Sequence, residues 1–315
     1  MICYVTEKMT DHITPETQEL INRAQVEMKQ ENWHDAAETL ADLYESLQTF
    51  DINNRLVTAL FMDKQYQLAS SYADDFLAEY LDDETHFRMI VALAVQNQSF
   101  VYAQQLAMLW DDEQTQSEIL DEIRTAENHA KETMATTLAT ISRQFYHMSD
   151  YDLDAQRNRY EAARRLPVAD FVIGAKFLLV DPFALPLIRA TLLEDLQKLD
   201  IQEPVQYRWL DEQLYTIRLD QINPLTSFEV FEKIATLIDD RLGQEDPVAL
   251  EMLAHQMRLE LTLLYPQTDD VIIDADSWVD SSLDRYYGQS NHTEVGLQKY
   301  WHDKVNEITN SFFEN

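Results

Sequence analysis

Glycine is the residue whose scarcity most constrains this chain. Only four of the 315 residues are glycine, and the first is Gly174. Tight hairpins and phosphate-binding loops place glycine where the backbone takes a positive φ or must approach a ligand closely. Because the first 173 residues contain none, this part of the chain is expected to form successive helices joined by short polar turns.

The composition predicts a folded and strongly acidic protein. The chain has 57 acidic and 24 basic residues, a formal net charge of -33, and 45% hydrophobic residues. Disorder requires low hydrophobicity together with high charge, and only the second condition holds here. Nucleic acids and anionic membranes both bind basic surfaces. We therefore predict neither a nucleic acid nor a membrane as partner.

Motifs for metals, cofactors and catalysis are missing from the sequence. Cys3 is the only cysteine, which excludes an intrachain disulfide and is typical of a cytoplasmic protein. No two of the eight histidines lie three or four residues apart, as a zinc-binding helix requires. The apolar stretch 171–180 is shorter than the roughly 20 residues that cross a bilayer. We predict no metal, cofactor or catalytic residue, and a disordered tail over residues 1–15, with either Met1 or Met9 as the start.

Three aromatic residues mark a repeat of helical hairpins. Trp33, Tyr66 and Phe100 each follow a short polar turn, with spacings of 33 and 34 residues. Apolar, mostly small residues recur in phase with them: Ala36, Ala69 and Ala103 three positions later; Leu40, Ala73 and Ala107 seven later; and Ala24, Val57 and Val91 nine earlier. Such in-phase positions indicate paired helices that stack on one another.

This pattern resembles the tetratricopeptide repeat, a 34-residue helix-turn-helix unit. The copies depart from the family in two places, since its first-helix glycine is replaced and its closing proline is missing. The resemblance implies an all-α, right-handed superhelix, or solenoid, whose first helices line a concave groove for extended peptides or partner helices.

One arginine in each first helix makes that groove the candidate site. Arg23, Arg55 and Arg88, with Asn54 beside them, are the predicted peptide- or partner-binding residues. Unpaired guanidinium groups in a row could hold carboxylates or peptide carbonyls. The alternative is that each arginine pairs with a neighbouring acid on a solvated face.

The solenoid is predicted to extend over residues 16–199. It includes one long helix over about 129–148 and a later repeat in which Phe183 takes the aromatic position, with Gly174 and Ala190 in phase. Arg157 and Arg164 share a helix face and form a possible secondary basic site. The alternative is that this basic cluster neutralises nearby aspartates over residues 150–154.

A second block, residues 200–315, is predicted to be helical with one small β-hairpin. Residues 205–219 alternate between apolar and polar residues on either side of a turn, as a strand pair does. Two helices are expected over about 227–242 and 247–264, and a last amphipathic helix near the end. The arrangement resembles bacterial cytoplasmic tetratricopeptide-repeat proteins of unassigned biochemical role.

The favoured function is non-enzymatic protein-protein interaction, as a scaffold, adaptor or assembly factor of open oligomeric state. One alternative is an enzyme or small-molecule-binding protein with a site between the solenoid and the C-terminal block, where Tyr207, Trp209, Arg218 and Trp278 could converge. The other is a peptide-sensing regulator that lacks a DNA-binding domain.

Overall fold

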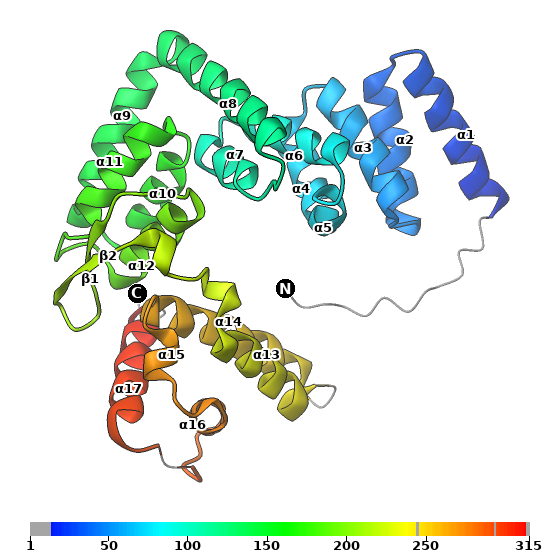
Figure 1. Ribbon diagram of the computed structural model, residues 1–315. Coiled ribbons are helices and arrows are strands. Elements are labelled where there is room, and N and C mark those ends of the chain that lie inside the picture. The colour runs from blue at the N-terminus through cyan, green and yellow to red at the C-terminus, as the bar shows by residue number, and fades with distance from the viewer. Residues whose placement is uncertain (1–13, 244–245, 293, 313–315) are drawn as a thin grey trace. The chain divides into compact units, whose positions relative to one another are not determined.

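A computed structural model describes residues 14–243, 246–292 and 294–312 of the chain (Figure 1). It is almost entirely helical, with one two-stranded sheet among the described residues. This confirms the predicted all-α class. The chain divides into two compact units, residues 1–126 and 127–315. The division into a solenoid over 16–199 and a block over 200–315 stays a prediction.

The predicted N-terminal tail lies outside the described residues as far as residue 13. Thr14 already caps the first helix, because its hydroxyl accepts a hydrogen bond from the Thr17 N–H, and Pro15 is the first helical residue. In the described part of the chain, no helix combines the length and the apolar character needed to cross a membrane.

The first unit is a series of helical hairpins. Its helices are α1 (Pro15–Lys29), α2 (Trp33–Ser46), α3 (Phe50–Met62), α4 (Tyr66–Ala73), α5 (Leu77–Tyr80), α6 (Glu84–Gln96) and α7 (Phe100–Ala107), with a 3₁₀ turn at Asp74–Phe76. Helix α8 (Glu113–Thr133) begins in this unit and ends in the second.

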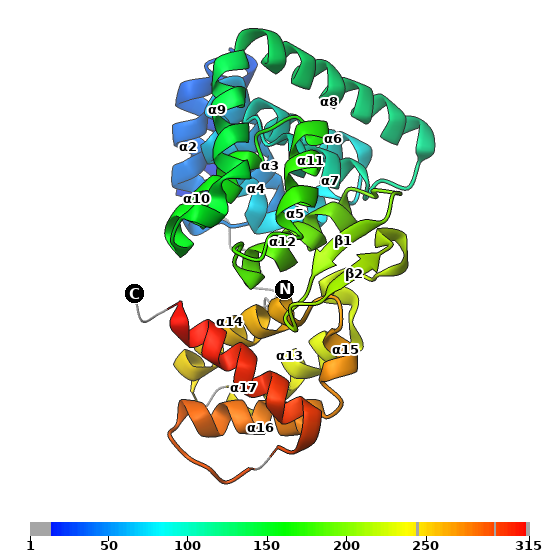
Figure 2. The ribbon, with the colours of Figure 1, turned by 90° about the vertical axis from the view of Figure 1, so that its left-hand side faces the viewer.

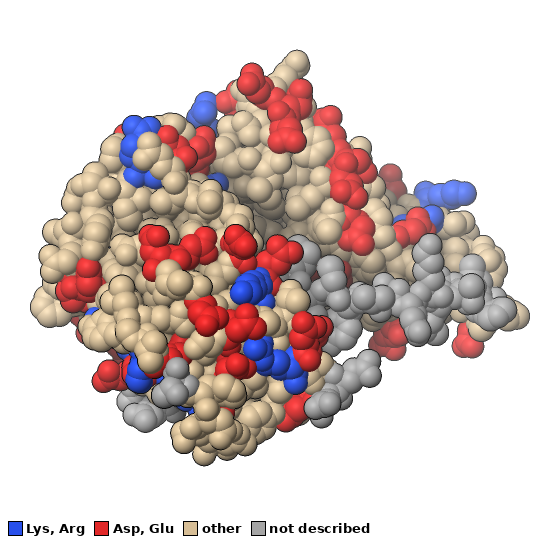
Figure 3. Space-filling model, turned by 60° about the horizontal axis from the view of Figure 1, so that its bottom comes forward, with Lys and Arg blue, Asp and Glu red and all other residues tan. Residues whose placement is uncertain are grey.

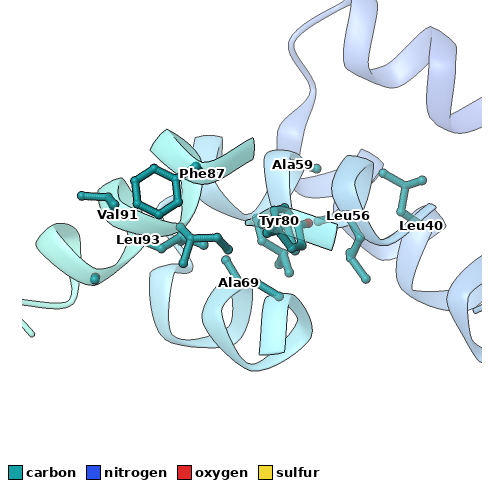
Figure 4. Close-up of a cluster of buried hydrophobic side chains, with 14 of the residues drawn as sticks. Leu40, Leu56, Ala59, Ala69, Tyr80, Phe87, Val91 and Leu93 are labelled. Carbon is teal, nitrogen blue, oxygen red and sulfur yellow. The ribbon is translucent and has the colours of Figure 1, made fainter. Parts of the chain in front are cut away.

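The repeat positions behave as the sequence predicts. Trp33, Tyr66 and Phe100 are the first residues of α2, α4 and α7. The alanines three positions later, Ala36, Ala69 and Ala103, are fully buried, and so are the other in-phase residues. Figure 4 shows Ala69 in the core that also holds Leu40, Leu56 and Tyr80. The small side chains therefore sit where paired helices approach most closely.

Each repeat turn places a residue other than glycine in the left-handed conformation, which was not predicted from the sequence. A non-glycine residue with positive φ lies two positions before each aromatic: Glu31 (58°), Lys64 (62°) and Gln98 (60°). The N–H of the next residue bonds to a carbonyl five residues back, as in a Schellman motif, in the pairs Asn32–Glu27 (3.0 Å), Gln65–Leu60 (2.9 Å) and Ser99–Ala94 (2.8 Å). The short polar turns predicted for this region without glycine are present, and the residue with positive φ in each is Glu31, Lys64 or Gln98. The capping bond and the core contacts offset a conformational cost of about 1–2 kcal/mol per residue.

The second unit contains the remaining elements. Its helices are α9 (Ala135–Tyr146), α10 (Leu153–Ala163), α11 (Val168–Leu178), α12 (Pro186–Lys198), α13 (Glu229–Leu242), α14 (Pro247–Leu264), α15 (Thr268–Val271), α16 (Ala275–Tyr286) and α17 (Gly296–Ser311). The strands are β1 (Val205–Arg208) and β2 (Leu214–Ile217), and 3₁₀ turns lie at Met148–Asp150, Leu219–Gln221 and Leu225–Ser227.

The predicted hairpin is confirmed. Strands β1 and β2 pair antiparallel, with Val205 opposite Ile217 and Tyr207 opposite Tyr215. Val205 and Tyr207 are buried, whereas Gln206 between them is exposed. The Tyr207 hydroxyl donates to the Tyr265 carbonyl (3.3 Å), which ties the sheet to the segment after α14. Helix α17 lies against α14 in the same unit (Figure 2), and the contacts Ser282–His302 and Arg285–Asp303 join it to α16.

Two sequence predictions are wrong in the middle of the chain. The helix expected over 129–148 is broken at Met134, whose φ of -125° ends α8 before α9 begins. Threonines flank this break at 133, 136 and 137, and β-branched residues lower helix propensity.

Phe183 does not open a second helix, because α12 starts at Pro186 and the Phe183 side chain is 78% exposed. Buried Arg189 donates to the carbonyls of Asp181 and Ala184 and so fixes this turn.

Candidate partner-binding surface

The three arginines predicted to line the groove are each paired with an acid one helical turn away. Arg23 Nε lies 2.8 Å from the Glu27 carboxylate on α1. Arg55 on α3 makes a two-point contact with Asp51, at 3.0 and 3.2 Å. Arg88 on α6 donates to Glu84 at 2.8 Å. The expectation of unpaired guanidinium groups is therefore wrong, because acidic residues are frequent enough to place a carboxylate beside each arginine.

Arg88 also connects two helices. Its Nη2 contacts Glu118 at 3.1 Å and its Nη1 contacts Glu122 at 3.2 Å, both on α8. The hydrogen bond that Arg88 donates to Glu84 is the main cause that raises the pKa of Arg88. One guanidinium group thus joins α6 to α8 through carboxylates that are about half or more exposed.

Asn54 makes the corresponding connection between α3 and α6. Its amide nitrogen lies 3.1 Å from His86 Nε2. The His86 ring packs edge-on against Phe50 (4.9 Å between centroids) and its Nδ1 contacts Asp83, the N-cap of α6. Asn54 is therefore a bridge between helices in addition to its position beside Arg55.

These contacts define a polar strip across α3, α6 and α8, which we call the first-helix strip: Asn54, His86, Arg88, Glu118 and Glu122. The structure brings two of the four predicted residues into it, Asn54 and Arg88, whereas the ion pairs of Arg23 and Arg55 stay within α1 and α3. Carboxylates outnumber guanidinium groups in the strip. Exposed ion pairs of this kind contribute about 0–1 kcal/mol each, so a partner's charged groups can replace them at little cost.

One face of the second unit has the same mixture of charges. Figure 3 shows acidic side chains spread over the face formed by the C-terminal helices, with the fewer basic groups beside them. Arg241, for example, contacts both Asp276 (3.2 Å) and Asp280 (2.8 Å). Basic side chains on this face mainly neutralise acidic neighbours.

The possible secondary basic site is not an open surface. Arg164 Nη1 donates to Asp195 (2.8 Å) and to the Tyr160 hydroxyl (2.8 Å), and Tyr160 itself donates to Asp195 (2.7 Å). Burial opposes the charge of Arg164, but the Asp195 carboxylate raises its pKa overall. Arg157 is exposed and takes no part in this group. Arg164 therefore pairs with an acid, as the alternative prediction stated. That acid is Asp195 on α12 and not one of the aspartates over 150–154.

The residues proposed for an enzyme site do not converge on an opening. Tyr207, Trp209 and Trp278 are buried and donate to the Tyr265 carbonyl, the Leu264 carbonyl and the Glu260 carboxylate. Arg218 is exposed and pairs with Asp220 at 2.7 Å. The three aromatic residues belong to the core, and Arg218 belongs to a surface ion pair.

Sequence reasoning missed a buried polar group in the second unit, which we call the His302 cluster: Glu260, Trp278, Ser282, Glu294 and His302. His302 Nδ1 lies 2.5 Å from Glu294 Oε2, and Nε2 lies 3.0 Å from Ser282 Oγ. The Trp278 ring stacks on the imidazole at 3.8 Å between centroids and 11° between planes. Its members come from α14, α16, α17 and the segment before α17.

Ser282 contacts His302, which in turn contacts Glu294, and a hydrolase triad has the same succession of serine, histidine and acid. The three side chains are at most 5% exposed, however, so a substrate cannot reach the serine in this conformation. A sequence signal for the cluster exists in α17. His302 shares the helix face of buried Val305 and Thr309, and a titratable residue on a buried face requires partners.

Comparison with known proteins agrees with the repeat geometry. The TPR repeat-containing protein YsoA of Bacillus subtilis (strain 168) is 26% identical over 125 residues, which cover 40% of this chain and 37% of that protein. The chain is tetratricopeptide-like. No family model and no solved structure matches it. The matched part is well under half of the relative's length, so the likeness supports the tetratricopeptide-like repeats.

Proposed function

We propose that the chain is a non-enzymatic protein-interaction module that acts in the cytoplasm as a scaffold, adaptor or assembly factor. It binds a peptide or partner helix along the first-helix strip. The observation that carries this proposal is the contact of Arg88 with carboxylates of two helices, Glu84 on α6 and Glu118 and Glu122 on α8.

The strip is preorganised by the repeats beneath it. Leu56 and Val57 on α3 and Phe87 and Val91 on α6 are buried on the core side of the same helices. Polar groups that rigid helices hold in place lose little conformational freedom on binding. The strip therefore offers fixed hydrogen-bonding groups at low entropic cost to the receptor.

The charge of the strip selects the partner. Arg55 and Arg88 are already matched by acids, and further carboxylates surround Arg88. A segment with lysine or arginine side chains gains attraction from these carboxylates and from the net charge of -33. We therefore propose a basic peptide or helix in place of the carboxylate-bearing ligand suggested by the arginines alone. Its affinity falls as salt increases.

The experiment is affinity capture from native cells, followed by crosslinking of the retained protein. A variant with Glu118→Gln and Glu122→Gln removes two charges from the strip, and its matched control, Asp42→Asn with Glu45→Gln, removes two exposed charges from α2. We expect the first variant to lose the partner and the control to keep it, with equal thermal stability. Equal retention by both contradicts the strip as the binding site. Recovery of a small metabolite in place of a protein favours the small-molecule alternative.

A further inference from the structure

Exposed apolar side chains gather at the start of α17. Ile273, in the segment before α16, is 77% exposed, and Val295 and Leu297 at the start of α17 are 79% and 64% exposed. Tyr300 lies on the same side of α17 as Leu297, one turn further along, and is 55% exposed. Apolar side chains that are exposed singly are ordinary, whereas a group of them marks a contact surface. We call these four residues the Ile273 patch.

One glutamine on α17 holds Ile273 in this place. The Gln298 side-chain oxygen accepts from the N–H groups of Ile273 (3.0 Å) and Asp274 (2.9 Å), and its nitrogen donates to the Asp274 carbonyl (3.0 Å). The same nitrogen donates to the buried Glu294 carboxylate (2.8 Å). Gln298 directly follows Leu297, so these bonds fix the segment next to the first turn of α17.

The fold cannot relieve the exposure of Ile273. Its neighbour Ile272 is 4% exposed and packs in the core. A rotation of the segment that buried Ile273 would expose Ile272 and break the hydrogen bonds to Gln298. The patch is therefore rigid before any partner arrives, which lowers the entropic cost of covering it.

Three acidic side chains accompany the patch. Asp269 and Asp270 belong to α15, which contacts α17 (Figure 2), and Asp274 is the N-cap of α16. All three are exposed, and none forms an ion pair with another residue in the described part of the chain. Asp276, two residues further on, is by contrast paired with two basic side chains. The patch thus combines apolar side chains with carboxylates that have no counter-charge.

These charges decide what can cover the apolar side chains. The carboxylates repel an anionic lipid surface. A second copy of the chain would bring the same aspartates and a further net charge of -33. Lysine or arginine side chains of another protein gain attraction from the three carboxylates. The elements around the patch are helices and a turn, so it has no sheet edge for an extended peptide, and an apolar helix face fits it.

We propose that the Ile273 patch is a docking site for an amphipathic helix of another protein, with aliphatic side chains on one face and basic residues at its edges. The aliphatic face covers Ile273 and Leu297, and the basic residues meet Asp269, Asp270 and Asp274. This surface lies within the second unit. It is separate from the first-helix strip and does not depend on the proposed function.

The probe is a short fluorescent peptide of leucine and lysine in amphipathic helical order, and anisotropy measures its affinity for the full chain. The variant Ile273→Ser with Leu297→Ser should weaken binding by about tenfold or more, since two aliphatic contacts are lost. The matched control is Phe183→Ser with Val248→Ser, because these residues are 78% and 65% exposed in the same unit. The control should bind as the wild type does. Equal affinities of the two variants would overturn the proposal, and so would a wild type that does not bind the peptide.

The acidic side chains are tested in the same way. Asp269→Asn with Asp270→Asn should weaken binding by about threefold and reduce its salt dependence, because two attractive charges are lost. The control is Asp239→Asn with Asp240→Asn, an exposed aspartate pair at the end of α13, which should have no such effect. A peptide with alanine in place of leucine keeps every charge. If it binds as tightly as the leucine peptide, attraction is by charge alone and the apolar patch is not a docking site.

Hydrogen exchange separates this site from the first-helix strip. The peptide should protect residues 268–274 and 295–301, and Glu118→Gln with Glu122→Gln should not change that protection. Protection of α3, α6 and α8 alone would overturn the proposal while leaving the first-helix strip intact. Two further results would give the patch another occupant and overturn the proposal: a dimer in sedimentation that Ile273→Ser abolishes, or tighter peptide binding after deletion of residues 1–13.

Discussion

Gly174 lies against the ring of Phe145, so closely that a Cβ atom on the glycine would be 2.6 Å from Phe145 Cδ1. Phe145 is fully buried and stacks on Phe171 at 5.4 Å, so the ring has no free direction in which to move. Here glycine serves the close approach of α11 to α9, since its backbone is helical.

Gly174→Ala should therefore destabilise the protein although alanine favours helix. We expect a loss of about 1–3 kcal/mol in the free energy of unfolding from overpacking, measured by urea denaturation. Helix propensity alone predicts a gain of about 1 kcal/mol, and such a gain would contradict the packing. In a Phe145→Leu background the cost of Gly174→Ala should be smaller, since the smaller side chain leaves room.

The repeat alanines should be equally intolerant of size. Ala103 is fully buried in α7, and Ala103→Leu should cost about 1–3 kcal/mol by denaturation. The matched control is Ala139→Leu on α9, an exposed helical alanine, which should change stability by less than about 0.5 kcal/mol. Similar effects at both positions would mean that the small residues do not set the spacing of the helices.

The turns with positive φ predict the opposite response to glycine. Glu31→Gly should be neutral or stabilising by up to about 1 kcal/mol, because relief of the left-handed strain exceeds the gain in unfolded-chain entropy. Gln30→Gly, one residue earlier with a φ of -89°, should destabilise. Thermal unfolding of the two variants measures the difference, and the reverse order would be incompatible with the turn conformation.

Arg157 and Arg164 should differ sharply when they are replaced. Arg164→Met leaves the Asp195 carboxylate buried without its ion-pair partner, which costs about 3–5 kcal/mol. Arg157→Met at an exposed position should cost less than about 0.5 kcal/mol. Denaturation of both variants measures this difference. Equal, small effects would show that Arg164 behaves as a surface residue and would contradict its place in the core.

Local patterns were the part of the fold that could be predicted. The aromatic and small residues of the repeats recur at fixed spacing, so their burial followed from periodicity. The hairpin followed from alternation between residues 205 and 219. Both signals lie within one or two neighbouring elements, where sequence distance and spatial distance agree.

What could not be predicted depends on residues far apart in sequence. Asp195 neutralises Arg164 from 31 residues away. Likewise, His302 on α17 lies near Glu260 on α14. The pairing of Arg88 with α8 likewise needed the positions of Glu118 and Glu122. The arginines were predicted to be free, but each one pairs with an acid one turn away on its own helix, and only Arg88 also gains acids from the next helix.

The most direct test of the account is hydrogen exchange of the chain with and without the captured partner. We predict that binding protects the segments of α3, α6 and the first part of α8, and that 0.5 M salt weakens this protection. Protection confined to residues 127–315, with the first-helix segments unchanged, would contradict partner binding along the first-helix strip.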